Sequence, residues 1–293
     1  MKWFRRLFGL GSDSGERSSE PIVNEDSQAM LESLQLRYAG YYLPAIHLRQ
    51  GESNGFSRLG GLPSMPYGME WPSWQNKPQA FLAQLDLGAM GEALPSFLPD
   101  TGYLYFFYDQ DQGEWGFDPN DFGAWRVLYV QGDPSGFLPY SVPEGLAEES
   151  IYRPKAVVPQ RIELLPDSLS LPKAEWDWDR EGDAYDALRL AAFEGQPLHQ
   201  VLGYPSPVQD DDMEVECQLA SNGIYMGSPE GHNDPRIPEL KKEASDWKLL
   251  LQLDSDEETG WMWGDSGVLY FWIRESDARK GDFSKVWLVL QCC

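Results

Sequence analysis

A block that occurs twice decides the fold of this chain. Residues 82–86 read LAQLD and, after a loop, residues 100–106 read DTGYLYF. Residues 250–254 read LLQLD and, after a second loop, residues 265–271 read DSGVLYF. The order, the residue types and the approximate spacing agree between the copies, and this agreement predicts an internal duplication.

Each copy predicts a set of strands, because a third apolar run follows at 125–130 and at 286–290. In the first copy, strict alternation places Phe81, Ala83 and Leu85 on one face of their strand. The aromatic run that follows this strand predicts a neighbouring strand covered on both faces.

Two polar pairs share one strand orientation in the two copies. Gln84 and Asp86 point away from the apolar face of the first strand, as Gln252 and Asp254 do in the second copy. Pseudo-symmetry could bring the four side chains together at a ligand site between the repeats. The alternative, which we favour, is a pair of structural hydrogen-bond networks.

The composition favours a β-rich fold with irregular connections, since the chain holds 28 Gly and 22 Pro. We expect an α+β, β-rich fold of internally duplicated antiparallel sheets with a few flanking helices. Residues 1–25 are predicted to form a flexible N-terminal tail. Residues 26–293 are predicted to form a single domain of two pseudo-repeats, about 55–135 and 199–293, joined by a segment that connects them or adds edge strands.

The net charge of -24 restricts the partners. Such a field repels phosphates, so we expect no nucleic-acid binding, and it favours a basic protein partner. The alternative is that the charge serves solubility alone. The apolar run near the N-terminus is too short for a membrane span, so no stable membrane insertion is expected.

The three cysteines, Cys217, Cys292 and Cys293, do not make a disulfide framework. A reducing compartment suits them, which predicts a cytoplasmic protein. No nucleotide-binding motif or zinc spacing is present, so no cofactor is predicted.

Two motifs resemble catalytic signatures, and their context favours turns. The DTG and DSG triplets would place Asp100 and Asp265 as an aspartic-protease dyad, yet each triplet starts a strand instead of ending one. The sequence GDSG at 264–267 lacks a histidine in a telling context, because His47, His199 and His232 belong to no catalytic motif. No catalytic residue is therefore predicted.

The loop after the second Gln-Asp pair resembles a calcium-binding loop. Asp254, Asp256 and Glu258 occupy alternate positions, and Asp265 stands where a last carboxylate would. The glycine falls one position late and the flanks indicate strands instead of helices. A solvated acidic loop is the favoured interpretation, with these four residues as the candidate metal ligands.

Several motifs in combination resemble the YwqG-like family, a bacterial domain of unknown function. They are SRLGGLP at 57–63, FLAQLDL at 81–87, HQVLGYP at 199–205, LLQLDSD at 250–256 and WGDSGVLYFWI at 263–273. The resemblance covers nearly the whole chain from about residue 30. It implies a cytoplasmic α+β domain, and it brings no established reaction. Some relatives are similar to members of toxin–immunity neighbourhoods, which implies a protein-binding role.

The leading hypothesis is a non-enzymatic, immunity- or adaptor-like protein-binding domain. Aromatic residues and arginine often anchor interfaces, so Arg58, Trp71, Trp115 and Trp261 are the candidate contacts. Core packing is the alternative for each tryptophan. The alternative function is a small-ligand or metal-binding protein, or a hydrolase, with its site between the two repeats.

Overall fold

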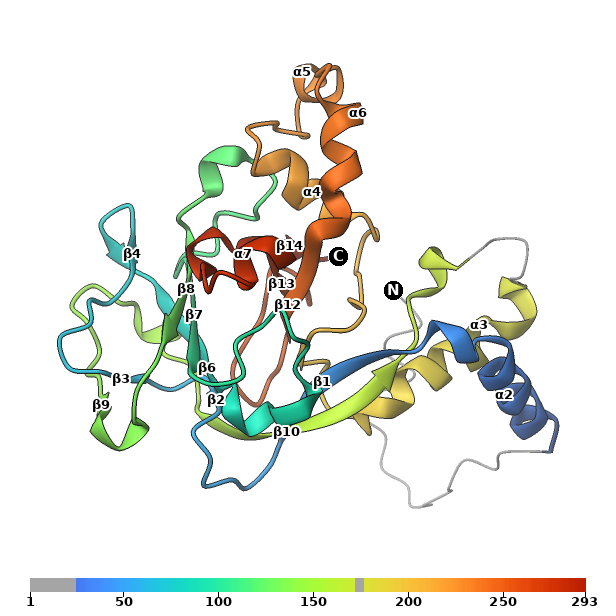
Figure 1. Cartoon of the computed structure of the whole chain (residues 1–293), viewed down its shortest axis with the longest axis horizontal. Coiled ribbons are helices and arrows are strands. Elements are labelled where there is room, and N and C mark those ends of the chain that lie inside the picture. Colours follow the sequence, from blue (N-terminus) through green and yellow to red (C-terminus); the bar gives the residue numbers. More distant parts are fainter. Residues whose placement is uncertain (1–24, 172–176) are drawn as a thin grey trace, which may run out of the picture.

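A computed structural model describes residues 25–171 and 177–293, and its framework is one ten-stranded antiparallel sheet (Figure 1). The strands lie in the order β14, β13, β12, β11, β1, β10, β2, β6, β7, β8. Their bounds are β1 Leu43–Gln50, β2 Arg58–Leu59, β6 Ala80–Asp86, β7 Tyr103–Tyr108, β8 Trp125–Val130, β10 Lys155–Leu164, β11 Gln200–Val201, β12 Trp247–Asp254, β13 Val268–Arg274 and β14 Trp287–Gln291. The predicted fold class is confirmed, because the two copies form β6–β8 at one end of the sheet and β12–β14 at the other.

The strand order is symmetric about its centre, where β1 pairs with β10. β10 comes from the segment that was expected to connect the halves or to add edge strands, and it lies instead in the middle of the sheet. In the described chain, β2 pairs with β10 at Lys155 and Ala156 alone. Pro159, which has no N–H to donate, lies beyond that pairing, and this explains how a central strand can carry a proline.

A β-bulge interrupts the first strand of each copy, between Phe81 and Ala83 in β6 and at the matching place in β12. The extra residue turns Phe81 to the opposite side from Leu85. Phe81 packs in a cluster with Tyr105 and Phe107, whereas Leu85 packs in the main core. The prediction that Phe81, Ala83 and Leu85 share one face is therefore wrong for Phe81.

The two halves of the sheet share one hydrophobic core. The rings of Phe106 in β7 and Phe271 in β13 lie 5.2 Å apart, edge to face. Trp125 in β8 contacts Trp287 in β14, and its Nε1 donates a hydrogen bond of 2.7 Å to the carbonyl of Val286. Strands from the two ends of the sheet meet in these contacts, which shows that the sheet is strongly curved.

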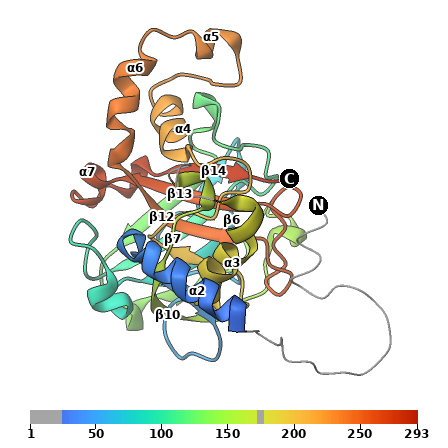
Figure 2. The ribbon, with the colours of Figure 1, turned by 90° about the vertical axis from the view of Figure 1, so that its right-hand side faces the viewer.

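Helices flank the sheet at two places (Figures 1 and 2). α2 and α3 pack side by side, joined by an ion pair of 2.6 Å between Arg37 and Glu181. α4 packs against β12 and β14 of the second half. The helix bounds are α2 Glu25–Arg37, α3 Trp178–Leu190, α4 Met213–Ala220, α5 Pro229–His232, α6 Ile237–Leu240 and α7 Glu275–Ala278, with the 3-10 helix η9 at Lys241–Asp246.

Two small sheets lie beside the first half. β3 (Ser64–Met65) pairs with β9 (Leu138–Pro139), and β4 (Ser73–Trp74) pairs with β5 (Lys77–Pro78). Among the described residues, no helix combines the length and the apolar character that crossing a membrane requires. The predicted N-terminal tail lies almost wholly outside the described residues.

Candidate functional site

Gln84 holds the loop that precedes its own strand. Its Nε2 donates a hydrogen bond of 2.8 Å to the carbonyl of Phe56, and its Oε1 accepts one of 2.9 Å from the N–H of Ser64. The hydroxyl of Tyr105 donates to the carbonyl of Ser64 at 2.7 Å. The amide of Gln84 is buried, so these bonds replace those that water would make.

Gln252 repeats this arrangement in the second half. Its Nε2 donates to the carbonyl of Leu198 and its Oε1 accepts from the N–H of Ser206, both at 2.8 Å. The hydroxyl of Tyr270 donates to the carbonyl of Ser206 at 2.6 Å. Each glutamine is bonded within its own half, and four strands lie between β6 and β12 in the sheet. The structure does not join Gln84 to Gln252.

The paired aspartates are anchored by equivalent backbone contacts. The N–H of Asp86 donates to Oγ of Ser57 at 2.9 Å, and the N–H of Asp254 donates to Nδ1 of His199 at 3.1 Å. The carboxylate of Asp254 accepts from the N–H of Leu198 at 3.1 Å. Burial raises the pKa of Asp254. In each half, the Gln-Asp pair and its strand thus hold one segment, residues 56–64 or 198–206, by hydrogen bonds. We call this arrangement the loop clamp.

Arg58 serves the same loop in the first half. Its Nη2 donates to the carbonyl of Leu62 and, at 3.5 Å, to Oγ of Ser64. In the second half, the Nε2 of Gln200 donates to the carbonyl of Tyr204 at 2.8 Å in the equivalent place. Burial lowers the pKa of Arg58. The guanidinium thus has a structural role that a neutral amide also fills.

The candidate tryptophans lie in different environments. Trp71 is half-buried, and its Nε1 donates to the carbonyl of Gln79 at 2.9 Å. Trp115 is partly exposed, whereas Trp261 is buried and packs on His199 with ring centroids 5.3 Å apart. Trp261 cannot contact a partner without local unfolding.

A buried cluster that the sequence motifs did not indicate surrounds Asp256. Nε2 of His199 lies 3.5 Å from Oδ2 of Asp256. The same oxygen accepts a hydrogen bond of 2.7 Å from Gln50 and one of 2.9 Å from Thr259. Burial alone would raise the pKa of Asp256, but the contacts with His199 and Gln50 outweigh it and lower the pKa below its ordinary value. His199 is completely shielded from solvent, so this cluster suits a structural role.

His47 is expected to make stability depend on pH. Burial lowers its pKa from 6.5 to about 4. Below pH 6.5 the unfolded chain therefore binds a proton that the folded chain does not bind until about pH 4, and the unfolding free energy should fall by about 3 kcal/mol over this window. Raised pKa values, about 7 for Asp211 and about 8 for Glu216, act in the opposite direction.

The informative quantity is thus the difference in unfolding free energy between the wild type and His47→Leu, measured by urea titration from pH 7 to pH 4. The difference should shrink as the pH falls. His232→Leu, which changes an exposed histidine, is the control. A difference that is constant with pH would contradict the role of His47.

The carboxylates of the calcium-like loop do not come close enough together to bind one metal ion. Asp256 is bonded within its buried cluster, Asp254 is held by the loop clamp, and Glu258 and Asp265 are exposed. Asp265 and Asp100 lie in turns that precede β13 and β7. This placement agrees with the interpretation of the DTG and DSG triplets as turns.

A different acidic group gathers at the start of α4. Among residues 25–171 and 177–293, ligand atoms of three acidic, histidine or cysteine side chains come within 4.8 Å of one another at Asp210, Asp212 and Glu216. Burial, followed by the charges of the two aspartates, raises the pKa of Glu216 to about 8. Carboxylate oxygens are the ligands that divalent cations prefer. This group was not predicted from the sequence. The four-residue spacing of Asp212 and Glu216 is the only sequence signal that could have indicated it.

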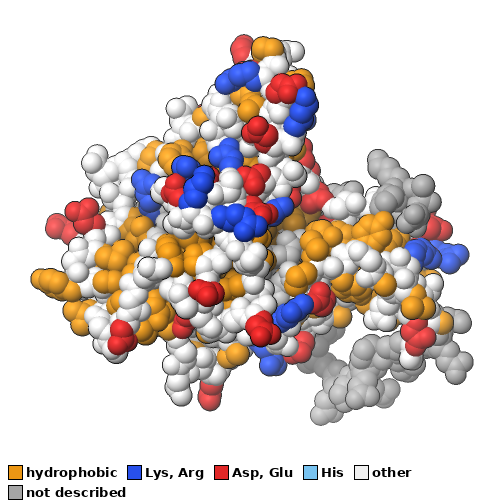
Figure 3. Space-filling model, viewed as in Figure 1, with side chains coloured by type: hydrophobic (Ala, Val, Ile, Leu, Met, Phe, Trp, Pro, Cys, Tyr) orange, Lys and Arg blue, Asp and Glu red, His pale blue; other side chains and the backbone are white. Residues whose placement is uncertain are grey.

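Two exposed apolar side chains belong to the small sheet of β3 and β9 and its loops: Leu138 in β9, and Tyr67 in the turn that follows β3. Together with the half-buried Phe56, Trp71 and Phe137, we call them the β3–β9 face. Tyr67 is 88% exposed and Leu138 is 50% exposed. Figure 3 shows apolar side chains gathered over β3, β9 and the neighbouring strands, at the left of the view. The half-buried residues belong to the aromatic cluster that covers the outer side of β6 and β7.

The loop that carries Tyr67 is fixed by hydrogen bonds from Tyr140. The hydroxyl of Tyr140 donates to the carbonyls of Pro66 and Met69 at 2.8 and 2.9 Å. Tyr103 of the same cluster lies near the carboxylates of Asp86 and Asp133. Burial, and then these two charges, raise the pKa of Tyr103. The β3–β9 face is therefore a supported apolar surface beside negative charge.

One comparison with known proteins gives a match. A family model described as a domain of unknown function (DUF1963) matches residues 57–292, from the loop of Arg58 to the end of the sheet. No curated protein matches the chain. The match covers the Gln-Asp pairs of both copies and, apart from Phe56, the residues of the β3–β9 face.

Proposed function

The chain belongs to the DUF1963 family, the family of the YwqG-like proteins, and we propose that it is a non-enzymatic protein-binding domain that docks a basic partner on the β3–β9 face. The observation that carries this proposal is the exposure of Leu138 in β9 and of Tyr67 in the turn that follows β3, a turn fixed by hydrogen bonds from Tyr140. Exposed aromatic anchors over a packed base are typical of interface centres.

The charge of the molecule supports a basic partner. The chain carries 47 acidic and 23 basic residues, and carboxylates border the aromatic cluster under the face. Complementary charge speeds association and excludes acidic competitors. The three cysteines make no disulfide, which suits a cytoplasmic, immunity- or adaptor-like domain.

The alternative site between the two repeats has less support. The amides of Gln84 and Gln252, which motivated it, are bonded to their own loops. The space between the halves is filled by the shared core. A ligand there would have to replace bonds that already satisfy buried groups.

The test is capture from the native cell lysate with the tagged chain, at low and at high salt, followed by mass spectrometry. Tyr67→Arg with Leu138→Arg places positive charge on the β3–β9 face and should reduce the captured basic partner at least about tenfold. Leu36→Arg is the matched control, because Leu36 is 81% exposed on α2, outside this face. High salt should weaken capture by the wild type.

Equal capture of the same proteins by the wild type, the double variant and the Leu36→Arg control would overturn the proposal. So would the absence of any stoichiometric partner of the wild type. Equal melting temperatures of the three proteins would show that a loss of capture is not a loss of folding.

A further inference from the structure

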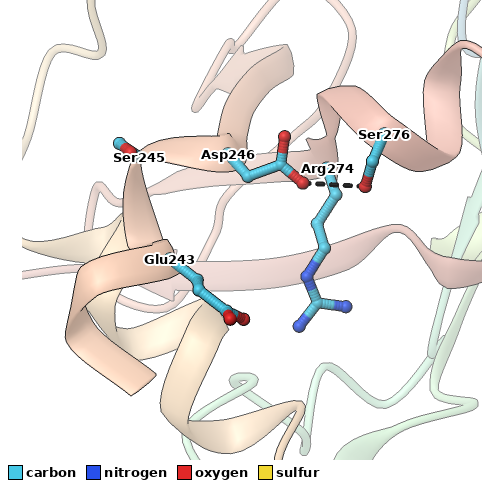
Figure 4. A pocket seen from close by; sticks show the side chains of 5 residues that line it. All are labelled: Glu243, Ser245, Asp246, Arg274 and Ser276. Carbon is cyan, nitrogen blue, oxygen red and sulfur yellow. Dashed lines mark hydrogen bonds between the residues drawn. The ribbon is translucent and has the colours of Figure 1, made fainter. Parts of the chain in front are cut away.

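A polar hollow lies beside the second half of the sheet (Figure 4). Its volume is about 450 Å³. η9, which leads into β12, contributes Glu243, Ser245 and Asp246, while Arg274 ends β13 and Ser276 lies in α7. Two segments that are distant in sequence, 243–246 and 274–276, therefore bring one cation and two carboxylates to the same space.

Arg274 is held in place before any ligand arrives. Its guanidinium lies 4.4 Å above the ring of Trp247, and its Nη2 donates to Gln218 at 3.1 Å and to Ser221 at 2.9 Å. Gln218 is itself fixed by the Nε1 of Trp247 at 2.9 Å. No described residue makes a hydrogen bond or an ion pair with the Nε or Nη1 of Arg274. A guanidinium held in this way has donors to spare and loses little freedom on binding.

The two carboxylates are also positioned. Oδ2 of Asp246 accepts a hydrogen bond of 2.8 Å from the hydroxyl of Ser276, and Oε2 of Glu243 accepts one of 3.4 Å from Gln218. In Figure 4 the carboxylate of Glu243 and the guanidinium of Arg274 extend toward the same space, and the Asp246–Ser276 pair lies above them. Each carboxylate keeps a second oxygen that can accept a further hydrogen bond.

The duplication shows that this hollow is not part of the common framework. Asp109 follows Tyr105 by four residues, as Arg274 follows Tyr270, so the two occupy equivalent places. Asp109 is buried and accepts a hydrogen bond of 3.0 Å from the N–H of Gly113 in its own loop. The equivalent place is thus closed by a local loop in the first half and borders a hollow in the second.

We propose that the hollow binds the α-carboxylate and α-ammonium of a free amino acid. The carboxylate would accept a charge-assisted hydrogen bond from Nη1 of Arg274, because Nη2 already donates to Gln218 and to Ser221. Glu243 and Asp246 would accept the ammonium, and their negative charge disfavours a phosphate or any ligand that is only anionic. An amino acid carries both charges on one carbon. This site lies in the second half, apart from the β3–β9 face, and the inference goes beyond the proposed function.

Calorimetric titration of the full chain tests the inference, using each standard free L-amino acid in turn. For an amino acid that binds, the N-acetyl derivative lacks the ammonium and the amide lacks the carboxylate, so each should bind at least about tenfold more weakly. Equal binding of either derivative would overturn the proposal. So would the absence of heat with every amino acid up to about 10 mM, where even weak complexes form.

Two variants locate the ligand. Arg274→Gln and Glu243→Gln should each weaken binding at least about tenfold, because each removes one charged contact. Glu243→Gln leaves the stack of Arg274 on Trp247 intact, so it tests the site even if Arg274→Gln unfolds. Arg279→Gln is the matched control, because Arg279 is paired with Glu275 on α7 and does not line the hollow. A folded Glu243→Gln that binds like the wild type would contradict the assignment.

Discussion

Gly116→Ala should prevent the two ends of the sheet from meeting. A Cβ on Gly116 would lie 1.7 Å from the carbonyl oxygen of Leu288, and the φ of Gly116 is +87°. The loop around it is clamped to β14, since Leu290 donates to the carbonyl of Trp115 at 3.0 Å and Trp287 to that of Gly116 at 2.8 Å. We expect a loss of at least about 4 kcal/mol, because backbone must move on both sides.

Thermal unfolding of the purified variant, together with its soluble yield, measures the effect. Gly136→Ala is the control, because a Cβ at Gly136 meets nothing within 4 Å and its φ is not positive. That control should unfold within about 1 kcal/mol of the wild type. If Gly116→Ala unfolded at the temperature of its control, the close contact between the loop and β14 would be wrong.

Gln252→Leu should cost about 3 kcal/mol of unfolding free energy. The substitution leaves the carbonyl of Leu198 and the N–H of Ser206 without their buried partner, and each unsatisfied group costs about 1–3 kcal/mol. Leucine cannot satisfy either group, and no water reaches Gln252 at 0% exposure. The melting temperature should fall by about 6–12 °C.

Urea unfolding of Gln252→Leu measures this cost, with Gln84→Leu as the equivalent variant and Gln131→Leu as the exposed control. The equivalent variant should lose a similar amount, since Gln84 makes the same two bonds. The exposed control should change little. A loss below 1 kcal/mol for Gln252→Leu would show that the loop clamp is not needed for stability.

Much of the framework could be predicted from local patterns. The apolar runs at 103–108 and 125–130 coincide with β7 and β8, and the second copy repeats them in β13 and β14. The shared orientation of Gln84 and Gln252 was also predictable, because alternation is set by the strand itself. The bulge after Phe81 was not, since an extra residue in a strand appears only in its pairing with a neighbour.

The candidate sites were less predictable. Arg58 and Trp71 were predicted because arginine and aromatic residues often anchor interfaces, and the Gln-Asp pairs because they recur in both copies. Arg58 and the Gln-Asp pairs instead hold loops together by hydrogen bonds. The hollow at Arg274 depends on η9, α4 and α7 meeting at the end of β13, and no spacing in the sequence records that meeting. The exposure of Tyr67 likewise depends on which segment covers the loop that carries it.

By itself, the sequence determined the duplication, the strands of both copies and the family, because these follow from patterns within short segments and from their recurrence. Only the tertiary structure decided that β10 lies beside β1 at the centre, that both halves share one core, and where charge and apolar surface are left open. The physical reason is that burial and pairing are properties of segments distant in the chain, and they exist only once those segments pack.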